Sequence, residues 1–192
     1  MTREGRIAGE DTGPASLAFH RTTWADLPTI QQWLRRPHVA RYWAHQTDDA
    51  AIARDFGGSI DGTEPCADYM VVCAGVPIGF IQRSRISDYP EELRELTELV
   101  PVPQECLMID YLLGDPDWLG RGLGTEMVRA FTELCWLEVP DAGEIIVAVS
   151  ANNVASFSAL SSAGYTRIAS GRLTPDNPGD DGWHHVYQRL RP

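Results

Sequence analysis

The chain has 192 residues, of which 43% are hydrophobic, and this suits a single domain with a sizeable core. Its net charge of −11 argues against nucleic acid as a partner, because nucleic acid requires a basic face. The same charge would attract a small cationic molecule, although many soluble proteins are simply acidic.

The N-terminal segment carries charges but lacks the apolar core of a secretory signal, and no apolar stretch is long enough to span a bilayer. We therefore expect a flexible tail at residues 1–15, a single domain at 16–192, a cytoplasmic protein and no membrane partner. The cysteines show neither CxxC spacing nor a nearby histidine cluster, so we expect buried free thiols and no metal: Cys66, Cys73, Cys106 and Cys135.

The first half of the chain predicts a strand over 16–23, then a helix over 24–36 with Thr23 as its N-cap, and a short helix over 38–43. A further helix in the segment DDAAIARDFGG is expected to end at its two glycines, Gly57 and Gly58. Two β-rich runs, 68–75 and 76–86, meet at a turn near Gly75 and predict an antiparallel hairpin.

The second half begins with an acidic insertion at 88–104, which is bounded by prolines and is expected to be surface structure or a lid. Strands and helices then alternate, and the expected elements are a strand over 105–114, a helix over 122–139, a strand over 144–150, a helix that stops at Gly164, and strands over 165–173 and 183–190. This order predicts an α/β protein with a mixed sheet, parallel neighbours in the second half, and helices on the faces of the sheet.

A glycine-rich loop, DPDWLGRGLGTEMVRAF, joins a buried strand to a strong helix. Its G-x-G-x-G spacing does not fit a dinucleotide fingerprint, and no Lys-Ser/Thr pair follows as a P-loop requires. Two interpretations remain open. The amides of residues 120–125, assisted by Arg121, could bind a phosphate at the start of the helix, expected near Thr125. Alternatively, the glycines only allow a turn with positive φ.

The segment RGLG, with Arg121, Gly122 and Gly124, resembles the acyl-CoA pyrophosphate loop of the GNAT acetyltransferase superfamily. The resemblance extends over residues 17–190 and is closest to the aminoglycoside 6′-N-acetyltransferases. Its further stretches are WLRRPHVARYW, DYMVVCAGVPIGFIQ, IDYLL and NNVASFSALSSAGY. It implies a GNAT-type mixed central sheet, partly splayed, with helices on both faces. It also implies acetyl-CoA as co-substrate, no metal, and antibiotic resistance through acetylation of the 6′-amine of an aminoglycoside.

Asp110 is the candidate catalytic residue, because it is a lone carboxylate in the otherwise apolar run LMIDYLL. A carboxylate in such a strand is costly unless it is paired or faces a cleft, and clefts are where function concentrates. The structural alternative is an ion pair with an arginine such as Arg83. The resemblance implies that Asp110 is the base that accepts the proton of the amine.

The resemblance also implies the remaining site residues. Leu112 and Leu113 would offer backbone groups to the pantetheine arm, with an amide near Leu112 as oxyanion donor. The other implied cofactor-binding residues are Leu119, Gly120, Arg121, Gly122, Leu123, Gly124, Thr125, Asn153 and Ser156; Asn153 could instead be only an N-cap. Trp43, Tyr69 and Gln82 would line the acceptor pocket beside Asp110, while core packing is the alternative for Trp43 and Tyr69.

Two positions depart from the family pattern. Leu160 stands where many GNAT enzymes carry a tyrosine as general acid, and Ser158 and Ser161 are nearby hydroxyls. Ala148 stands where 6′-acetylating resistance enzymes carry an aspartate. These departures keep two alternatives open, which are an acyltransferase for another small amine (siderophore-type or polyamine) and a non-catalytic module that binds acyl-CoA or antibiotic. The expected state is a monomer or a homodimer, with the strand over 183–190 as a possible sheet edge for dimerisation.

Overall fold

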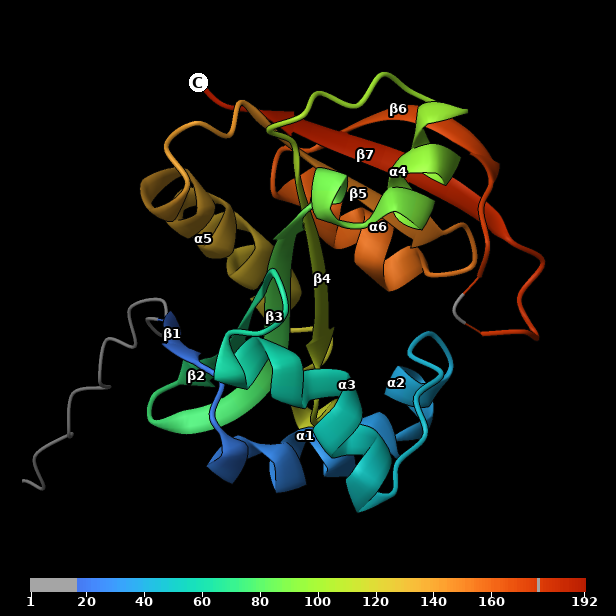
Figure 1. The fold of residues 1–192 in the computed structure, drawn as a ribbon. Helices are drawn as coiled ribbons and strands as arrows, with labels where there is room; N and C mark the ends of the chain where they lie inside the picture. The colour runs from blue at the N-terminus through green and yellow to red at the C-terminus, as the bar shows by residue number, and fades with distance from the viewer. Residues whose placement is uncertain (1–16, 176) are drawn as a thin grey trace, which may run out of the picture.

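The computed structural model describes residues 17–175 and 177–192 (Figure 1), so the tail expected at 1–15 lies outside the described residues. A seven-stranded mixed sheet runs through the molecule in the order β1-β2-β3-β4-β5-β7-β6, which confirms the predicted fold class. Its strands are β1 Leu17–Arg21, β2 Cys66–Cys73, β3 Val76–Arg85, β4 Leu107–Leu113, β5 Glu144–Ser150, β6 Thr166–Arg172 and β7 Trp183–Leu190.

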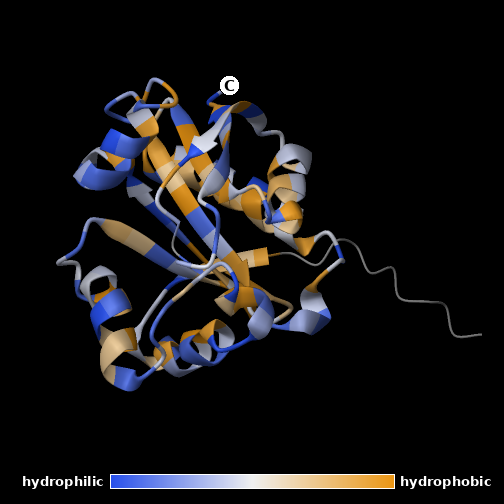
Figure 2. Ribbon diagram, turned by 90° about the vertical axis from the view of Figure 1, so that its right-hand side faces the viewer, coloured by the Kyte–Doolittle hydropathy of each residue, from blue (hydrophilic) through white to orange (hydrophobic). Residues whose placement is uncertain are grey.

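Helices cover both faces of this sheet. They are α1 Leu27–Leu34, α2 Pro37–Ala40, α3 Asp49–Asp61, α4 Pro90–Thr97, α5 Leu123–Glu138 and α6 Val154–Ser162. One face packs against α5 and α6 in the largest hydrophobic cluster. On the opposite face, α1 to α3 cover the half that contains β2 to β4, and α4 covers the half that contains β5 and β7. In Figure 2, hydrophobic residues follow the central strands, while hydrophilic residues are frequent on the outer helices. Within the described ranges, none of the helices has the length and apolarity to cross a membrane.

The predicted hairpin is confirmed. Strands β2 and β3 pair in antiparallel fashion around Ala74 and Gly75, whose φ angles are 49° and 80°. Positive φ at both central residues gives a turn whose twist matches that of the flanking strands. A β-bulge lies just beyond it, because Val72 is opposite Pro77 while Val71 is opposite Gly79, which leaves Ile78 as the extra residue.

The sheet parts between β4 and β5. These strands are parallel, and they pair only through Leu107 opposite Ile145 and Met108 opposite Ile146. The parallel neighbours predicted for the second half are therefore present at this junction. They are absent at the next junction, because β7 lies between β5 and β6 and pairs antiparallel with both. The expectation that 183–190 forms a sheet edge is accordingly wrong, and β6 is the edge strand.

The end of α3 also differs from its prediction. The helix continues through Gly57 and Gly58 and ends at Gly62, whose φ of 71° provides the left-handed C-cap. A Cβ at Gly57 would lie 2.8 Å from the ring of Trp24, so this glycine permits close packing inside the helix rather than ending it.

The acidic insertion is partly core. Its helix α4 and the residues that follow bury Leu96 and Val100 in a hydrophobic cluster with Ile146 of β5 and Val186 of β7. Surface structure or a lid therefore describes only the outer side of this segment. The four cysteines are free thiols, and all but Cys66 are buried.

Candidate active site

A cavity of about 620 Å³ opens where β4 and β5 part, with α2, the end of β4 and the first turns of α5 and α6 as its walls. Most of the predicted cofactor-binding residues line it, namely Leu112, Leu113, Leu119, Gly120, Gly122, Gly124, Thr125, Asn153 and Ser156. We refer to it as the donor cavity. The fold thus brings together the end of one strand and the starts of two helices that are distant in sequence.

The glycine-rich loop has the positive φ angles that one interpretation of the sequence required. Gly120 and Gly122 have φ angles of 71° and 79°, and a Cβ at either would meet nothing within 4 Å. Gly122 is also the N-cap of α5, which begins at Leu123, earlier than the start expected near Thr125. The turn therefore requires glycine at these positions, and its bare backbone faces the donor cavity.

Two predicted cofactor residues do not line the donor cavity. The guanidinium of Arg121 lies over the ring of Trp118, at 5.5 Å from its centroid. Leu123 packs instead against the main hydrophobic cluster. Asn153, by contrast, is both the N-cap of α6, where its Oδ1 accepts a hydrogen bond from the amide of Ser156 at 3.2 Å, and a residue of the cavity wall.

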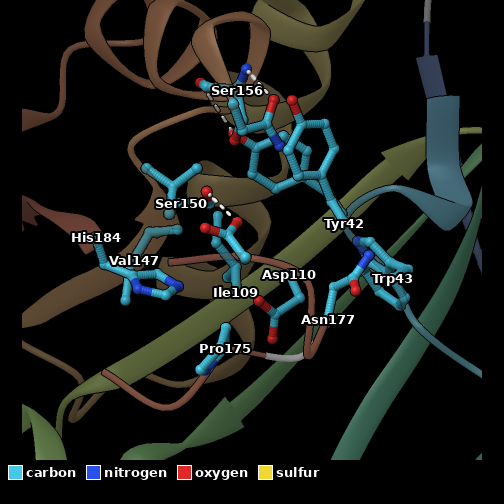
Figure 3. Close-up of a pocket in the computed structure, with 15 residues that line it drawn as sticks. Tyr42, Trp43, Ile109, Asp110, Val147, Ser150, Ser156, Pro175, Asn177 and His184 are labelled. Atoms are coloured by element: carbon cyan, nitrogen blue, oxygen red, sulfur yellow. Dashed lines mark hydrogen bonds between the residues drawn. The ribbon is translucent and has the colours of Figure 1, made fainter. Parts of the chain in front are cut away.

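A second, smaller cavity of about 80 Å³ contains Asp110 and Trp43, and we refer to it as the acceptor cavity (Figure 3). The two cavities adjoin, because five residues line both of them: Tyr42, Trp43, Tyr111, Asn153 and Ser156. In Figure 3 the carboxylate of Asp110 points toward Pro175 and Asn177. Asp110 therefore lies close to the boundary between two separate binding volumes.

The position of Asp110 follows from alternation along β4. Leu107 and Ile109 face α5, whereas Leu112 joins the cluster beneath α1 to α3 and Met108 packs with the cluster under α4. Asp110 shares the face of these last two residues and lies between the two clusters. The side chain of Asp110 thus lies on a part of the sheet that is covered neither by the cluster beneath α1 to α3 nor by the cluster under α4.

Gln82 contacts Asp110 directly. It is opposite Asp110 in the β3–β4 ladder, and its Nε2 donates a hydrogen bond to Oδ2 of Asp110 at 3.3 Å. Arg83, the structural alternative considered for Asp110, points to the other face and pairs with Glu138 at 2.8 Å. The alternative interpretation, an ion pair between Asp110 and Arg83, is therefore wrong.

Tyr69 is not brought to this site. It is 4% exposed, its hydroxyl donates to Oε2 of Glu138 at 2.5 Å, and its ring packs edge-on against Phe131 at 5.2 Å. These partners belong to α5, on the face opposite Asp110. Trp43 does reach the acceptor cavity, with its ring edge-on to that of Phe80 at 5.9 Å.

Several residues of the acceptor cavity were not foreseen from the sequence: Tyr42, Ser150, Asn177, Asp180 and His184. Ser150 donates to Oδ2 of Asp180 at 2.6 Å, and this bond, the largest of the contributions, lowers the pKa of Asp180. Asn177 donates to the carbonyl of Arg41 at 3.0 Å, which ties the 174–182 loop to the segment after α2. The sequence signal for Asp180 is the pair of carboxylates in GDDG, in the turn-rich segment that joins the last two strands.

The two departures from the family pattern are both visible. Ala148 lines the acceptor cavity, so β5 contributes no carboxylate there, while Asp180 of the neighbouring loop does. Leu160 is fully buried in the main cluster. Of the nearby hydroxyls, Ser158 lines the donor cavity, and Ser161 donates back to the carbonyl of Phe157 at 2.9 Å.

This arrangement can do acid–base chemistry on a bound amine. One carboxylate adjoins a volume lined by bare backbone, and a second carboxylate, two tyrosines and a tryptophan surround the space beside it. Carboxylates and aromatic faces both attract ammonium groups. No cluster of side chains in the described part of the chain has the composition of a metal site.

The chain is similar to known proteins in both sequence and fold. The family model described as an acetyltransferase (GNAT) domain matches residues 22–173. The aminoglycoside N(6')-acetyltransferases type 1 of Klebsiella pneumoniae and Serratia marcescens are each 28% identical to the chain, over 85% of it and 80% of their own length. The crystal structure of the aminoglycoside acetyltransferase AAC(6')-Ib with coenzyme A superimposes with a TM-score of 0.79 at 26% identity, covering 92% of this chain and 95% of that one. Its complex with coenzyme A and kanamycin gives a TM-score of 0.77.

Proposed function

The chain belongs to the GNAT acetyltransferase family, and on this premise we propose that it acetylates the 6′-amine of an aminoglycoside, with Asp110 as the base. Acetyl-CoA-dependent acetyl transfer is the activity of the family. The acceptor and the roles of individual residues are our proposal. The observation that carries it is the position of Asp110 in an acceptor cavity that shares a wall with the donor cavity.

The donor cavity fits acetyl-CoA in the chemistry of its walls. The end of β4 at Leu112 and Leu113 has no partner from β5, so its backbone could pair with the amide-bearing pantetheine arm as an added strand. The amides from Gly120 to Thr125 belong to the loop before α5 and to its first turn, where the helix dipole favours a pyrophosphate. Arg121 would need a different side-chain orientation from the one over Trp118 to reach that group.

The proposed reaction is direct attack. The neutral amine attacks the thioester carbonyl while its proton passes to Asp110, and the carboxylate is oriented by the hydrogen bond from Gln82. A backbone amide near Leu112 would donate to the oxyanion. Trp43 would offer an aromatic face, and Asp180 would attract a second ammonium group of the acceptor. Holding both substrates in adjoining cavities supplies much of the rate.

Ala148 favours a second candidate acceptor. Because β5 offers no carboxylate on the face of Asp110, a smaller amine with fewer positive charges, such as a siderophore-type amine or a short polyamine, would lose fewer contacts than an aminoglycoside. A non-catalytic module that only binds acyl-CoA would instead bind ligand without releasing thiol.

A thiol-release assay tests these proposals with kanamycin, amikacin, a short polyamine, and an aminoglycoside that carries a 6′-hydroxyl in place of the amine. We expect turnover of the first two and none of the 6′-hydroxyl compound. Turnover of the polyamine alone would replace the aminoglycoside by a smaller amine. Tight binding of acetyl-CoA with no turnover of any amine would contradict the enzyme.

The same assay tests Asp110. Replacing it by asparagine keeps the shape and the hydrogen bond with Gln82 but removes the base, so we expect kcat to fall about 10²-fold or more while the KM for acetyl-CoA changes little. An unchanged kcat would remove Asp110 from this role.

A further inference from the structure

Tyr111 follows Asp110 directly on β4 and points to the opposite face of the sheet, toward α6. Its hydroxyl lies 2.8 Å from Oγ of Ser156 and 3.3 Å from the Ser156 carbonyl, to which it can donate. Both residues line the donor and the acceptor cavity, and Figure 3 shows Ser156 at the wall of the acceptor cavity. A base and a phenol thus flank the same stretch of β4 from its two sides.

The departing thiolate creates a need for such a group. Acetyl transfer breaks the bond between the acyl carbon and sulfur, and a proton supplied to the sulfur in that step contributes to the rate. Leu160 is fully buried and offers no proton, so another residue would have to supply it. Of the residues that line both cavities, only Tyr42 and Tyr111 carry a phenol.

Proton counting separates the two tyrosines. The single hydroxyl proton of Tyr42 is donated to the carbonyl of Asn152 at 3.0 Å. Tyr111 and Ser156 together carry two hydroxyl protons, and their mutual hydrogen bond requires only one, whichever residue donates it. When Ser156 donates the mutual bond, the phenol proton of Tyr111 is held by the longer contact to the Ser156 carbonyl at 3.3 Å.

We propose that Tyr111, supported by Ser156, is the general acid that protonates the departing thiolate. The inference rests on the proposed acetyl transfer but not on the identity of the amine. As the C–N bond forms and the C–S bond breaks, the amine proton passes to Asp110 and the phenol proton to sulfur. The phenolate then accepts the hydrogen bond of Ser156 and regains a proton from solvent, to which Asp110 releases its own.

The Tyr111 phenol carries its proton at neutral pH, because burial raises its pKa more than the hydrogen bond with Ser156 lowers it. The same shift makes the phenol a weaker acid, so the transfer depends on stabilisation of the phenolate. Ser156 lies in the first turn of α6, where the helix dipole favours a transient negative charge such as the phenolate.

Tyr111→Phe tests the inference, because it removes the hydroxyl and keeps the ring. We expect the single-turnover rate of thiol release to fall about 10²-fold. Coenzyme A affinity, measured by calorimetry, should stay unchanged. The matched control is Tyr165→Phe, which removes a buried hydroxyl that contacts Thr132 at 2.7 Å on the same side of the sheet. Tyr165→Phe should keep the wild-type rate of thiol release and lose about as much thermal stability as Tyr111→Phe.

The readout uses whichever amine the wild-type protein turns over, so failure of aminoglycosides as acceptors leaves the test intact. If the protein acetylates no amine, the rate of thiol release by hydrolysis of acetyl-CoA is measured instead, because hydrolysis breaks the same C–S bond. A Tyr111→Phe rate close to wild type overturns the proposal. Equal losses of rate in both phenylalanine variants would also overturn it, since they would assign the effect to general loosening of the core.

Discussion

At the scale of single residues, a row of polar side chains crosses three strands on the face of Asp110. Asp68 is opposite Gln82, and Gln82 is opposite Asp110. Asp68 is only 2% exposed, and Sγ of Cys66 donates to its Oδ1 at 3.2 Å. Burial raises the pKa of Asp68 and outweighs the lowering by Cys66, Ser59 and Arg21. The row therefore ends in a carboxyl group that is costly to ionise.

This cost predicts a pH dependence of stability. Because the pKa of Asp68 is higher in the folded than in the unfolded protein, the unfolded chain loses this proton first, and Asp68 becomes destabilising as the pH rises above its ordinary value of 3.8. Asp68→Asn removes the effect. The free energy of unfolding of the variant relative to wild type should increase with pH, by at most about 1.4 kcal/mol per pH unit.

Urea denaturation between pH 4 and pH 8 measures this difference. Glu133→Gln, on the exposed side of α5, is the matched control and should shift the curve by a constant amount at most. A difference between Asp68→Asn and wild type that does not change with pH would contradict the assignment.

At the scale of elements, the bulge at Ile78 turns Tyr69 away from the acceptor cavity, where the resemblance implied it would lie. Without it, the two-residue turn would pair Gln82 with Ala67, and Tyr69 would share the face of Gln82. The extra residue shifts the ladder by one, so Asp68 takes that face and Tyr69 turns to α5. A one-residue bulge leaves little trace in a pattern of apolar residues, although Pro77 beside it marks a place where regular pairing is weak.

The end of α3 gives a second prediction at this scale. Gly62→Ala places a side chain at a φ of 71°, which costs about 1 to 2 kcal/mol, although a Cβ there would meet nothing within 4 Å. Thermal or urea unfolding should show this loss. Gly143→Ala is the matched control, because a Cβ there also meets nothing within 4 Å and its φ is not positive. It should leave stability unchanged or raise it by about 0.4 to 1 kcal/mol. Equal effects of the two changes would contradict the cap.

At the scale of the whole molecule, the order of elements and the antiparallel hairpin could be predicted because they depend on local periodicity and turn residues. The position of β7 between β5 and β6 could not, since the final two strands have similar patterns and either could pair with β5. The same limit applies to the site. Asp110 stood out as a charge in an apolar strand, whereas Tyr42, Asn177 and Asp180 reach the acceptor cavity from loops whose paths depend on tertiary contacts.

The parting of β4 and β5 leaves backbone amides and carbonyls at the end of β4 without a strand partner from β5. On the proposed function, the donor completes the ladder with its own peptide-like groups. The backbone groups of β4 that β5 leaves unpaired would then select the donor, and particular side chains would not. Substitutions at Leu112 or Leu113 that keep the backbone conformation would therefore leave donor selectivity unchanged.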